Sequence, residues 1–215
     1  ATISPLIFAG FDRLRAMSAK NENPGIACRP FSDDRDGFVM AEGAAILVLE
    51  SEASARARNA KIYARILGYG ATGGAYHPVM PRPDGEDQTR AMQEALADAE
   101  LSPTDIDLIN PHGTGTRLND EAELAAMQTV FGEHLSHISI VPTKQLTGHM
   151  LGGAGALESL HVVKSIHEAC VTPIQFWESN TLLKIQTSAP LARKIRFAMN
   201  NSFGFGNNNA SLVFG

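Results

Sequence analysis

Two histidines follow buried-looking apolar segments of the sequence and precede helical ones. His112 lies directly after the apolar run 106–110, and His149 follows the apolar run 138–141 through the short segment 143–148. Because ligands bind at the carboxyl ends of parallel strands in open α/β sheets, we expect both imidazoles in one cleft. If His112 is considered alone, the alternative is that it lies in a loop without a function, in which the glycines only turn the chain.

A lysine and a glutamate near His149 form a second candidate group. Residues 150–158 carry mostly small side chains, which suit a helix packed in a buried central position. An ionised Glu158 inside such a helix needs a partner. Lys144 is the nearest cation upstream in sequence, so we expect these two residues to form an ion pair.

Three other patterns are better explained without chemistry. The glycines of 68–73 match a dinucleotide fingerprint, but prolines follow at once where a helix should begin, so we interpret them as a glycine-rich strand exit. No Cys, Asp or third His closely flanks His134 and His137, which favours surface histidines. Cys28 and Cys170 form no disulfide framework or zinc motif, and neither lies in the strand-to-helix elbow of a nucleophile.

Alternating elements must position these residues. Apolar periodicity predicts helices over 5–17, 51–59, 87–99, 119–131 and 152–169, and strands over 44–49, 62–69, 106–110, 138–141, 195–200 and 210–214. The run 44–49 is continuously apolar, so we expect a strand buried on both faces. Such alternation predicts an α/β layered fold. Gly204, Gly206 and residues 207–209, all asparagine, are expected to turn the chain between the last two strands, because glycine and asparagine tolerate positive φ.

The composition describes a globular chain without a basic surface for nucleic acid. The 215 residues are 44% hydrophobic, which is enough for a sizeable core. The chain has 18 Lys+Arg against 23 Asp+Glu and a net charge of -5, so it lacks the excess of basic residues that would neutralise the phosphates of a nucleic acid. No apolar stretch approaches the roughly 20 residues that cross a bilayer. We expect a soluble, cytoplasmic protein that binds neither nucleic acid nor membrane.

Three motifs follow one another along the chain: His-Gly-Thr-Gly-Thr at 112–116, Thr-Lys-Gln-Leu-Thr-Gly-His at 143–149 and Asn-Ser-Phe-Gly-Phe-Gly at 201–206. In this order they resemble the β-ketoacyl-acyl-carrier-protein synthases of the thiolase superfamily, most closely the elongating synthases of type II systems. The resemblance implies a thiolase-like layered αβαβα fold of two similar halves. Residues 1–60 would end the N-terminal half, and residues 61–215 would form the C-terminal β-ketoacyl synthase domain.

The chemistry that this resemblance implies is the decarboxylative Claisen condensation of a 3-oxoacyl-[acyl-carrier-protein] synthase, in fatty-acid or related polyketide synthesis. His112 and His149 match the donors that stabilise the malonyl thioester oxygen as carbon dioxide leaves. Lys144, supported by Glu158, would help to keep both histidines neutral. The resemblance implies no metal and no other cofactor, because the substrates are carried on the phosphopantetheine of acyl carrier protein.

The resemblance also implies substrate-binding positions. Thr114 and Thr116 match the hydroxyls that hold the phosphopantetheine arm. Phe203, Gly204 and Phe205 match the loop beside the acyl pocket, in which Phe205 is the gating aromatic ring and the glycines provide mobility.

A further implied surface is the one that docks the acidic carrier protein. Arg13, Arg15 and Lys20 match its basic residues, and ordinary solvated charges are the alternative. The other implied partner is a second synthase chain in a dimer.

The resemblance does not extend to the nucleophilic cysteine, which the family carries in its N-terminal half. No segment here resembles its Thr-Ala-Cys-Ser sequence, and the chain begins at Ala1 on a helix-like pattern, so we expect a trimmed or divided polypeptide that needs the missing half. A non-catalytic partner resembling a chain-length factor is the alternative, although retention of His112, His149 and Lys144 argues against it. Residues 176–179 and 207–209 also depart from the type II pattern, which leaves the acyl-chain preference open.

Overall fold

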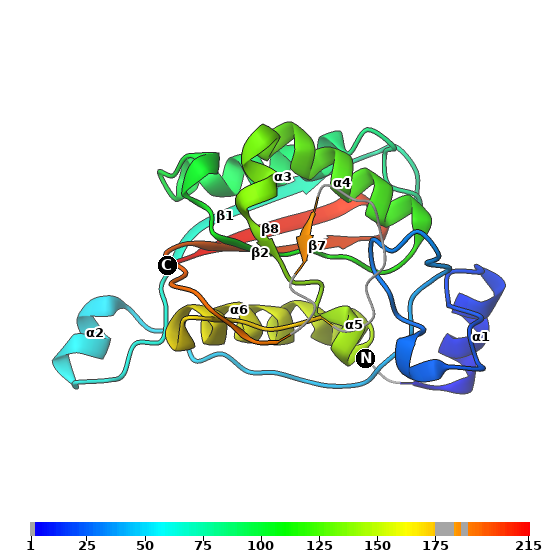
Figure 1. Ribbon diagram of the computed structural model, residues 1–215, viewed down its shortest axis with the longest axis horizontal. Coiled ribbons are helices and arrows are strands. Elements are labelled where there is room, and N and C mark those ends of the chain that lie inside the picture. Colours follow the sequence, from blue (N-terminus) through cyan, green and yellow to red (C-terminus); the bar gives the residue numbers. More distant parts are fainter. Residues whose placement is uncertain (1–2, 175–182, 186–188) are drawn as a thin grey trace.

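A mixed sheet forms the centre of the computed structural model, which describes residues 3–174, 183–185 and 189–215 (Figure 1). Its strands are β1 (Ile66–Gly73), β2 (Leu108–Asn110), β3 (Ser139–Ile140), β5 (Lys184–Ile185), β7 (Ala198–Gly204) and β8 (Asn208–Phe214). The spatial order is β1-β8-β7-β2-β3-β5. Strand β8 runs antiparallel to β1 and β7, whereas β7, β2, β3 and β5 run parallel to one another. The carboxyl ends of β2 and β3 therefore lie at one edge of the sheet.

Helices cover both faces of this sheet (Figure 1). Helices α3 (Glu86–Asp98) and α4 (Arg117–Phe131) lie on one face, and α5 (Lys144–Thr147) and α6 (Ala154–Glu168) lie on the other. Helices α1 (Pro5–Arg13) and α2 (Glu52–Ala57) stand at opposite ends of the molecule. The remaining short elements are the paired strands β4 (Cys170–Val171) and β6 (Leu191–Ala192) and the 3-10 turns Pro24–Ile26, Pro103–Asp105, Gly132–His137, Leu151–Gly153 and Phe205–Asn207.

The glycine cluster at 68–73 lies inside β1, where it permits close packing of α3. A Cβ atom at Gly68 would stand 2.2 Å from the carbonyl oxygen of Ala95, and one at Gly70 would stand 2.1 Å from that of Ala91. These glycines therefore allow the helix backbone to approach the strand closely, a common role of glycine in a strand interior. The strand was predicted to end at residue 69, but it begins later and continues through the glycines to Gly73.

The first helix is shorter than its apolar pattern predicts. The Ser4 side chain caps α1 by accepting a hydrogen bond from Ile7 N, and the helix ends at Arg13 rather than residue 17. Arg15 has a φ of 53°, in the left-handed region that stops a helix. Leu6 is 83% exposed, and α1 buries none of its residues within this chain.

The prediction of a buried strand over residues 44–49 is wrong for this chain. The segment is extended but belongs to no strand, and it runs alongside α6 from the α1 end of the molecule to the α2 end (Figure 1). Ile46, Val48 and Leu49 are 89%, 86% and 69% exposed. A central strand needs a hydrogen-bonded neighbour on each edge. Within the described ranges, no strand pairs with this segment.

The other predicted helices and strands are found within a few residues of their expected bounds, apart from the late start of β1. The short strands β4, β5 and β6 were not predicted. The departure at 176–179 lies outside the described residues. In the part of the chain that the structure describes, no helix is long and apolar enough to cross a membrane.

Candidate active site

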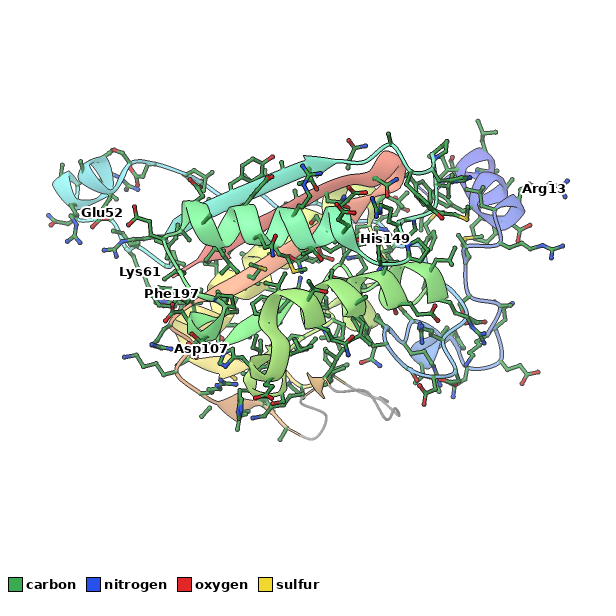
Figure 2. The ribbon with its side chains drawn as sticks, turned by 90° about the horizontal axis from the view of Figure 1, so that it is seen from above. Arg13, Glu52, Lys61, Asp107, His149 and Phe197 are labelled. Carbon is green, nitrogen blue, oxygen red and sulfur yellow. The ribbon has the colours of Figure 1, made fainter. Side chains whose placement is uncertain are left out.

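Strands β2 and β3 bring the two predicted histidines together. The ring centroids of His112 and His149 are 5.4 Å apart and the ring planes are nearly perpendicular, at 82°. Figure 2 shows His149 toward the end of the molecule that carries Arg13, whereas Asp107 and Phe197, which precede β2 and β7, lie toward the other end. The two imidazoles thus share the carboxyl edge of the parallel strands.

Backbone geometry beside His149 depends on a glycine. Gly148 has a φ of 67°, and a Cβ atom there would stand 2.8 Å from the Cβ of Ala41. The close approach lets His149 N donate to Val39 O at 2.7 Å, while Ala41 N donates to His149 O at 3.0 Å. The ring of Phe38 then packs edge-on against the His149 ring, with centroids 5.3 Å apart. Residues far upstream therefore hold His149 in place.

Hydrogen bonds at Nδ1 fix the same tautomer in both rings. The Nζ atom of Lys144 lies 3.3 Å from Nδ1 of His112, and Leu151 N donates to Nδ1 of His149 at 3.2 Å. An ammonium group and a backbone amide can only donate, so each Nδ1 accepts and each ring carries its proton on Nε2. Both histidines are therefore hydrogen-bond donors through Nε2.

Burial keeps these rings neutral. It lowers the pKa of His112 well below 6.5, and the positive charge of Lys144 and the neighbouring His149 lower it further. Burial, followed by the charge of Lys144, lowers the pKa of His149 to about 3. After desolvation, the charge of Lys144 is the second cause of both lowered pKa values.

Lys144 forms the predicted ion pair with Glu158. Its Nζ lies 2.5 Å from Oε1 of Glu158, and the two side chains are 1% and 2% exposed. The same Nζ donates to the carbonyl oxygen of His112. Burial raises the pKa of Glu158, and Lys144 acts against this rise. The pair thus connects α6 with the loop that carries His112.

Two buried carboxylates at the start of α4 were not predicted. Glu123 accepts hydrogen bonds from the backbone N–H groups of His112 and Gly113, both at 2.8 Å, and Asp120 accepts from Gly115 N at 3.2 Å. Burial raises the pKa of Glu123 to about 7. The available signal was their three-residue spacing, which puts both on the face of α4 that carries buried alanines.

Among the predicted substrate-binding residues, Phe203 lies beside His112. The hydroxyl oxygens of Thr114 and Thr116 are 2.8 Å apart, and the Phe203 ring centroid lies 6.2 Å from that of His112. Phe205 is 50% exposed, and its ring centroid lies 6.2 Å from that of Phe11 on α1.

The turn between β7 and β8 has positive φ at two of its predicted positions. Gly206 has a φ of 74° and Asn207 a φ of 53°. Gly204, by contrast, is extended with a φ of -118°.

The predicted docking residues differ in their surroundings. Arg13 and Arg15 are exposed at and just beyond the end of α1. Arg13 lies on the side of the molecule where His149 lies (Figure 2). Lys20 is half-buried, and its Nζ lies 2.7 Å from Oδ2 of Asp34. The same Asp34 oxygen lies 2.5 Å from Nη1 of Arg29, so this carboxylate offsets only part of the Lys20 charge.

Neither cysteine has the surroundings of an activated thiol. Burial raises the pKa of Cys28 to about 11, which leaves the thiol protonated. Cys170 is half-buried and is the first residue of β4. Across the described ranges, no cluster of three or more His, Cys, Asp or Glu side chains could hold a metal ion, and His134 and His137 lie only as a pair with ring centroids 5.9 Å apart.

Comparison with models of known protein families identifies the family to which this chain belongs. Residues 63–176 match the beta-ketoacyl synthase C-terminal domain, and residues 1–55 match the beta-ketoacyl synthase N-terminal domain. The chain belongs to the β-ketoacyl synthase family. It is 45% identical over 217 residues to 3-oxoacyl-[acyl-carrier-protein] synthase 2 of Staphylococcus aureus (strain COL), and 44% identical to the protein of the same name from Synechocystis. Each match covers 100% of this chain and 52% of the relative, so the chain spans about half their length.

Solved β-ketoacyl synthases share the fold. A chain from the complex of a type II PKS acyl-carrier protein with its ketosynthase superposes with a TM-score of 0.94 at 36% identity, covering 100% of this chain and 53% of its own length. A beta-ketoacyl synthase from Burkholderia phymatum STM815 gives 0.93 at 36% identity, with 100% and 52% covered. The predicted thiolase-like fold class is confirmed. The two relatives found by sequence are both named 3-oxoacyl-[acyl-carrier-protein] synthase 2, so the alternative of a chain-length factor is not favoured.

Proposed function

We propose that this chain supplies the oxyanion-stabilising part of a 3-oxoacyl-[acyl-carrier-protein] synthase active site. The reaction is a decarboxylative Claisen condensation. The bond between the α-carbon and the carboxylate of a malonyl thioester breaks, carbon dioxide leaves, and the electron pair becomes an enolate. The enolate carbon then attacks an acyl thioester on the enzyme, and the enzyme thiolate leaves.

The observation that carries this proposal is the pair of neutral rings that both donate through Nε2. As carbon dioxide leaves, negative charge collects on the thioester oxygen, and His112 and His149 would donate to it from two directions. Preorganised donors need no rearrangement when this charge develops, and loss of one typically costs about 10²–10³ in rate. Neutral donors also avoid taking up a proton themselves, because burial holds their pKa values low.

The nucleophilic cysteine is proposed to lie outside this chain, in the N-terminal half of the family. The chain would contribute the end of that half as residues 1–60 and the C-terminal domain as residues 61–215. We call the chain joined to that N-terminal half, in one polypeptide or as a second chain, the assembled synthase. We expect it to dimerise, as the family resemblance implies.

Condensation by the assembled synthase tests this function directly. With an acylated carrier protein and radiolabelled malonyl-carrier protein, we expect labelled 3-oxoacyl product and release of carbon dioxide. The 215-residue chain alone should form no product, since Cys28 is buried and protonated. An assembled synthase that becomes acylated but releases no carbon dioxide would contradict the proposal.

Acyl carrier protein is the proposed carrier of both substrates, with no metal or other cofactor in the reaction. Thr114 and Thr116 would hydrogen-bond its phosphopantetheine arm, next to His112 and the loop of Phe203, Gly204 and Phe205 that would gate the acyl pocket. A structural relative that is itself bound to an acyl-carrier protein supports this partner.

The exposed arginines Arg13 and Arg15 would attract the acidic carrier protein. Charge reversal of both should raise KM for malonyl-carrier protein and leave kcat nearly unchanged. Arg56→Glu on α2, at the other end of the molecule (Figure 1), is the control and should leave KM unchanged. Equal effects of the two changes would contradict an arginine docking surface at α1.

A further inference from the structure

A buried asparagine joins the two loops that carry the active-site groups. Asn110 is the last residue of β2 and is fully buried. Its Oδ1 accepts two hydrogen bonds from Thr143, one from the hydroxyl at 3.0 Å and one from the backbone N–H at 3.3 Å. Thr143 directly precedes Lys144, and Asn110 stands two residues before His112. One side-chain amide therefore connects the bases of both loops.

This contact stands where the backbone ladder between β2 and β3 ends. The last backbone bond in the ladder runs from Val141 N to Ile109 O at 2.9 Å. The next residues, Pro111 and Pro142, have no N–H group to donate, so the backbone cannot continue the pairing in its usual way. The amide of Asn110 supplies the connection between the strands that the prolines remove.

The Nδ2 end of the Asn110 amide is anchored to β7, the neighbour of β2 on the side away from β3. Its Nδ2 donates to Oδ1 of Asn200 on β7 at 2.8 Å, and Nδ2 of Asn200 donates to the hydroxyl of Ser159 on α6 at 3.3 Å. Ser159 is the neighbour of Glu158 in sequence. A buried polar network with its groups satisfied fixes one geometry, whereas an apolar pair of similar size would pack without fixing orientation.

The geometry points to Asn110 and Thr143 as positioning residues for decarboxylation, an inference that rests on the proposed function. Lys144 Nζ reaches both Nδ1 and the carbonyl oxygen of His112. These contacts require the loops that follow β2 and β3 to keep their present separation. The hydrogen bonds between Asn110 and Thr143 set that separation where the two loops begin. Neither residue needs to contact the substrate. If the loops move apart, Lys144 no longer holds the His112 ring as an Nε2 donor.

Thr143→Val tests this role in the assembled synthase, because it removes the hydroxyl and keeps the branched shape. We expect carbon dioxide release at saturating malonyl-carrier protein to fall by about 10- to 100-fold, the cost of a displacement of roughly 1 Å. KM for malonyl-carrier protein and the rate of cysteine acylation should stay unchanged. Thr143→Ser, which retains the donor, should restore most of the release.

Thr72→Val is the matched control. Thr72 is buried on β1 and its hydroxyl donates to Asp87 O at 2.6 Å, so the substitution also removes one buried hydroxyl bond. Release should stay near that of the unsubstituted protein. Equal release in Thr143→Val and Thr72→Val would overturn the inference, and so would a Thr143→Ser variant as slow as the valine variant. Thr143→Ala replaces the valine variant if the latter fails to fold.

Nitrogen chemical shifts of His112 separate this inference from the proposed function. In the unsubstituted assembled synthase we expect Nε2 protonated and Nδ1 accepting, and in Thr143→Val we expect the Nδ1 hydrogen bond to be lost. An unchanged Nδ1 signal in the variant would overturn the positioning role, whether or not the protein is active. Absence of carbon dioxide release from the unsubstituted protein would overturn the proposed function, and the nitrogen signal would then decide the positioning role.

Discussion

Lys144 donates a hydrogen bond to Nδ1 of His112 across 3.3 Å while its ammonium group lies 2.5 Å from the carboxylate of Glu158. The lysine therefore acts on the histidine in two ways. It places the ring proton on Nε2 by occupying Nδ1, and its charge disfavours a second proton. Glu158 makes this burial of a cation possible, because a lone ammonium group would be costly at 1% exposure.

The buried pair should therefore be more sensitive than an exposed one. Lys144→Met leaves the Glu158 carboxylate buried without its cation, and we expect a loss of about 3–5 kcal/mol in the free energy of unfolding of the assembled synthase. The control Lys164→Met breaks the exposed pair with Glu168, which should cost at most about 1 kcal/mol. Denaturant unfolding measures both. Equal losses would mean that the Lys144 pair is not effectively buried in the assembled protein.

The pH dependence of decarboxylation should report the neutral histidines. Glu123 under the His112 loop has a pKa of about 7 and would take up a proton near neutral pH. Because the pKa values of His112 and His149 lie below 6.5, the donors stay neutral as pH falls through 6.5, and the decline in rate caused by histidine protonation should come only at lower pH. In Lys144→Met/Glu158→Leu, loss of the cation raises both pKa values, so this decline should move to higher pH. Carbon dioxide release across the acidic range measures it. A decline at the same pH in both proteins would show that Lys144 does not influence the histidines.

The two histidine loops could be predicted from the sequence because local signals define them. An apolar run followed by Pro-His-Gly marks a strand end, and the rule that parallel strands share a carboxyl edge brings His112 and His149 together. The ion pair between Lys144 and Glu158 followed from the cost of a buried charge.

Other features depend on tertiary context that periodicity does not reveal. Carboxylates are almost always exposed, so the burial of Asp120 and Glu123 beneath the His112 loop gave no strong signal. Strands β4, β5 and β6 contain two residues each, too few for an alternating pattern. The apolar run 44–49 was interpreted as a central strand, but strand pairing requires neighbours that the described part of the chain does not supply.

The exposed apolar run 44–49 should make the 215-residue chain associate when it is alone. A contiguous apolar surface of this kind drives contacts between copies. Ile46→Lys combined with Val48→Lys should reduce the associated fraction in size-exclusion chromatography with light scattering. Leu118→Lys, which replaces a side chain that is 54% exposed on α4, is the control and should change it little. A monomeric chain with a sharp unfolding transition would be incompatible with this expectation.

The most direct test of the central claim is carbon dioxide release by His149→Ala in the assembled synthase, measured beside radiolabelled acylation of the cysteine. Removing one of two converging donors should lower release from malonyl-carrier protein by at least about 10²-fold and leave acylation largely intact. The control is His134→Ala. His134 lies next to His137, away from the active site, so this substitution should change neither step. Release by His149→Ala at the rate of the unsubstituted protein would contradict the claim that the two imidazoles stabilise the enolate together.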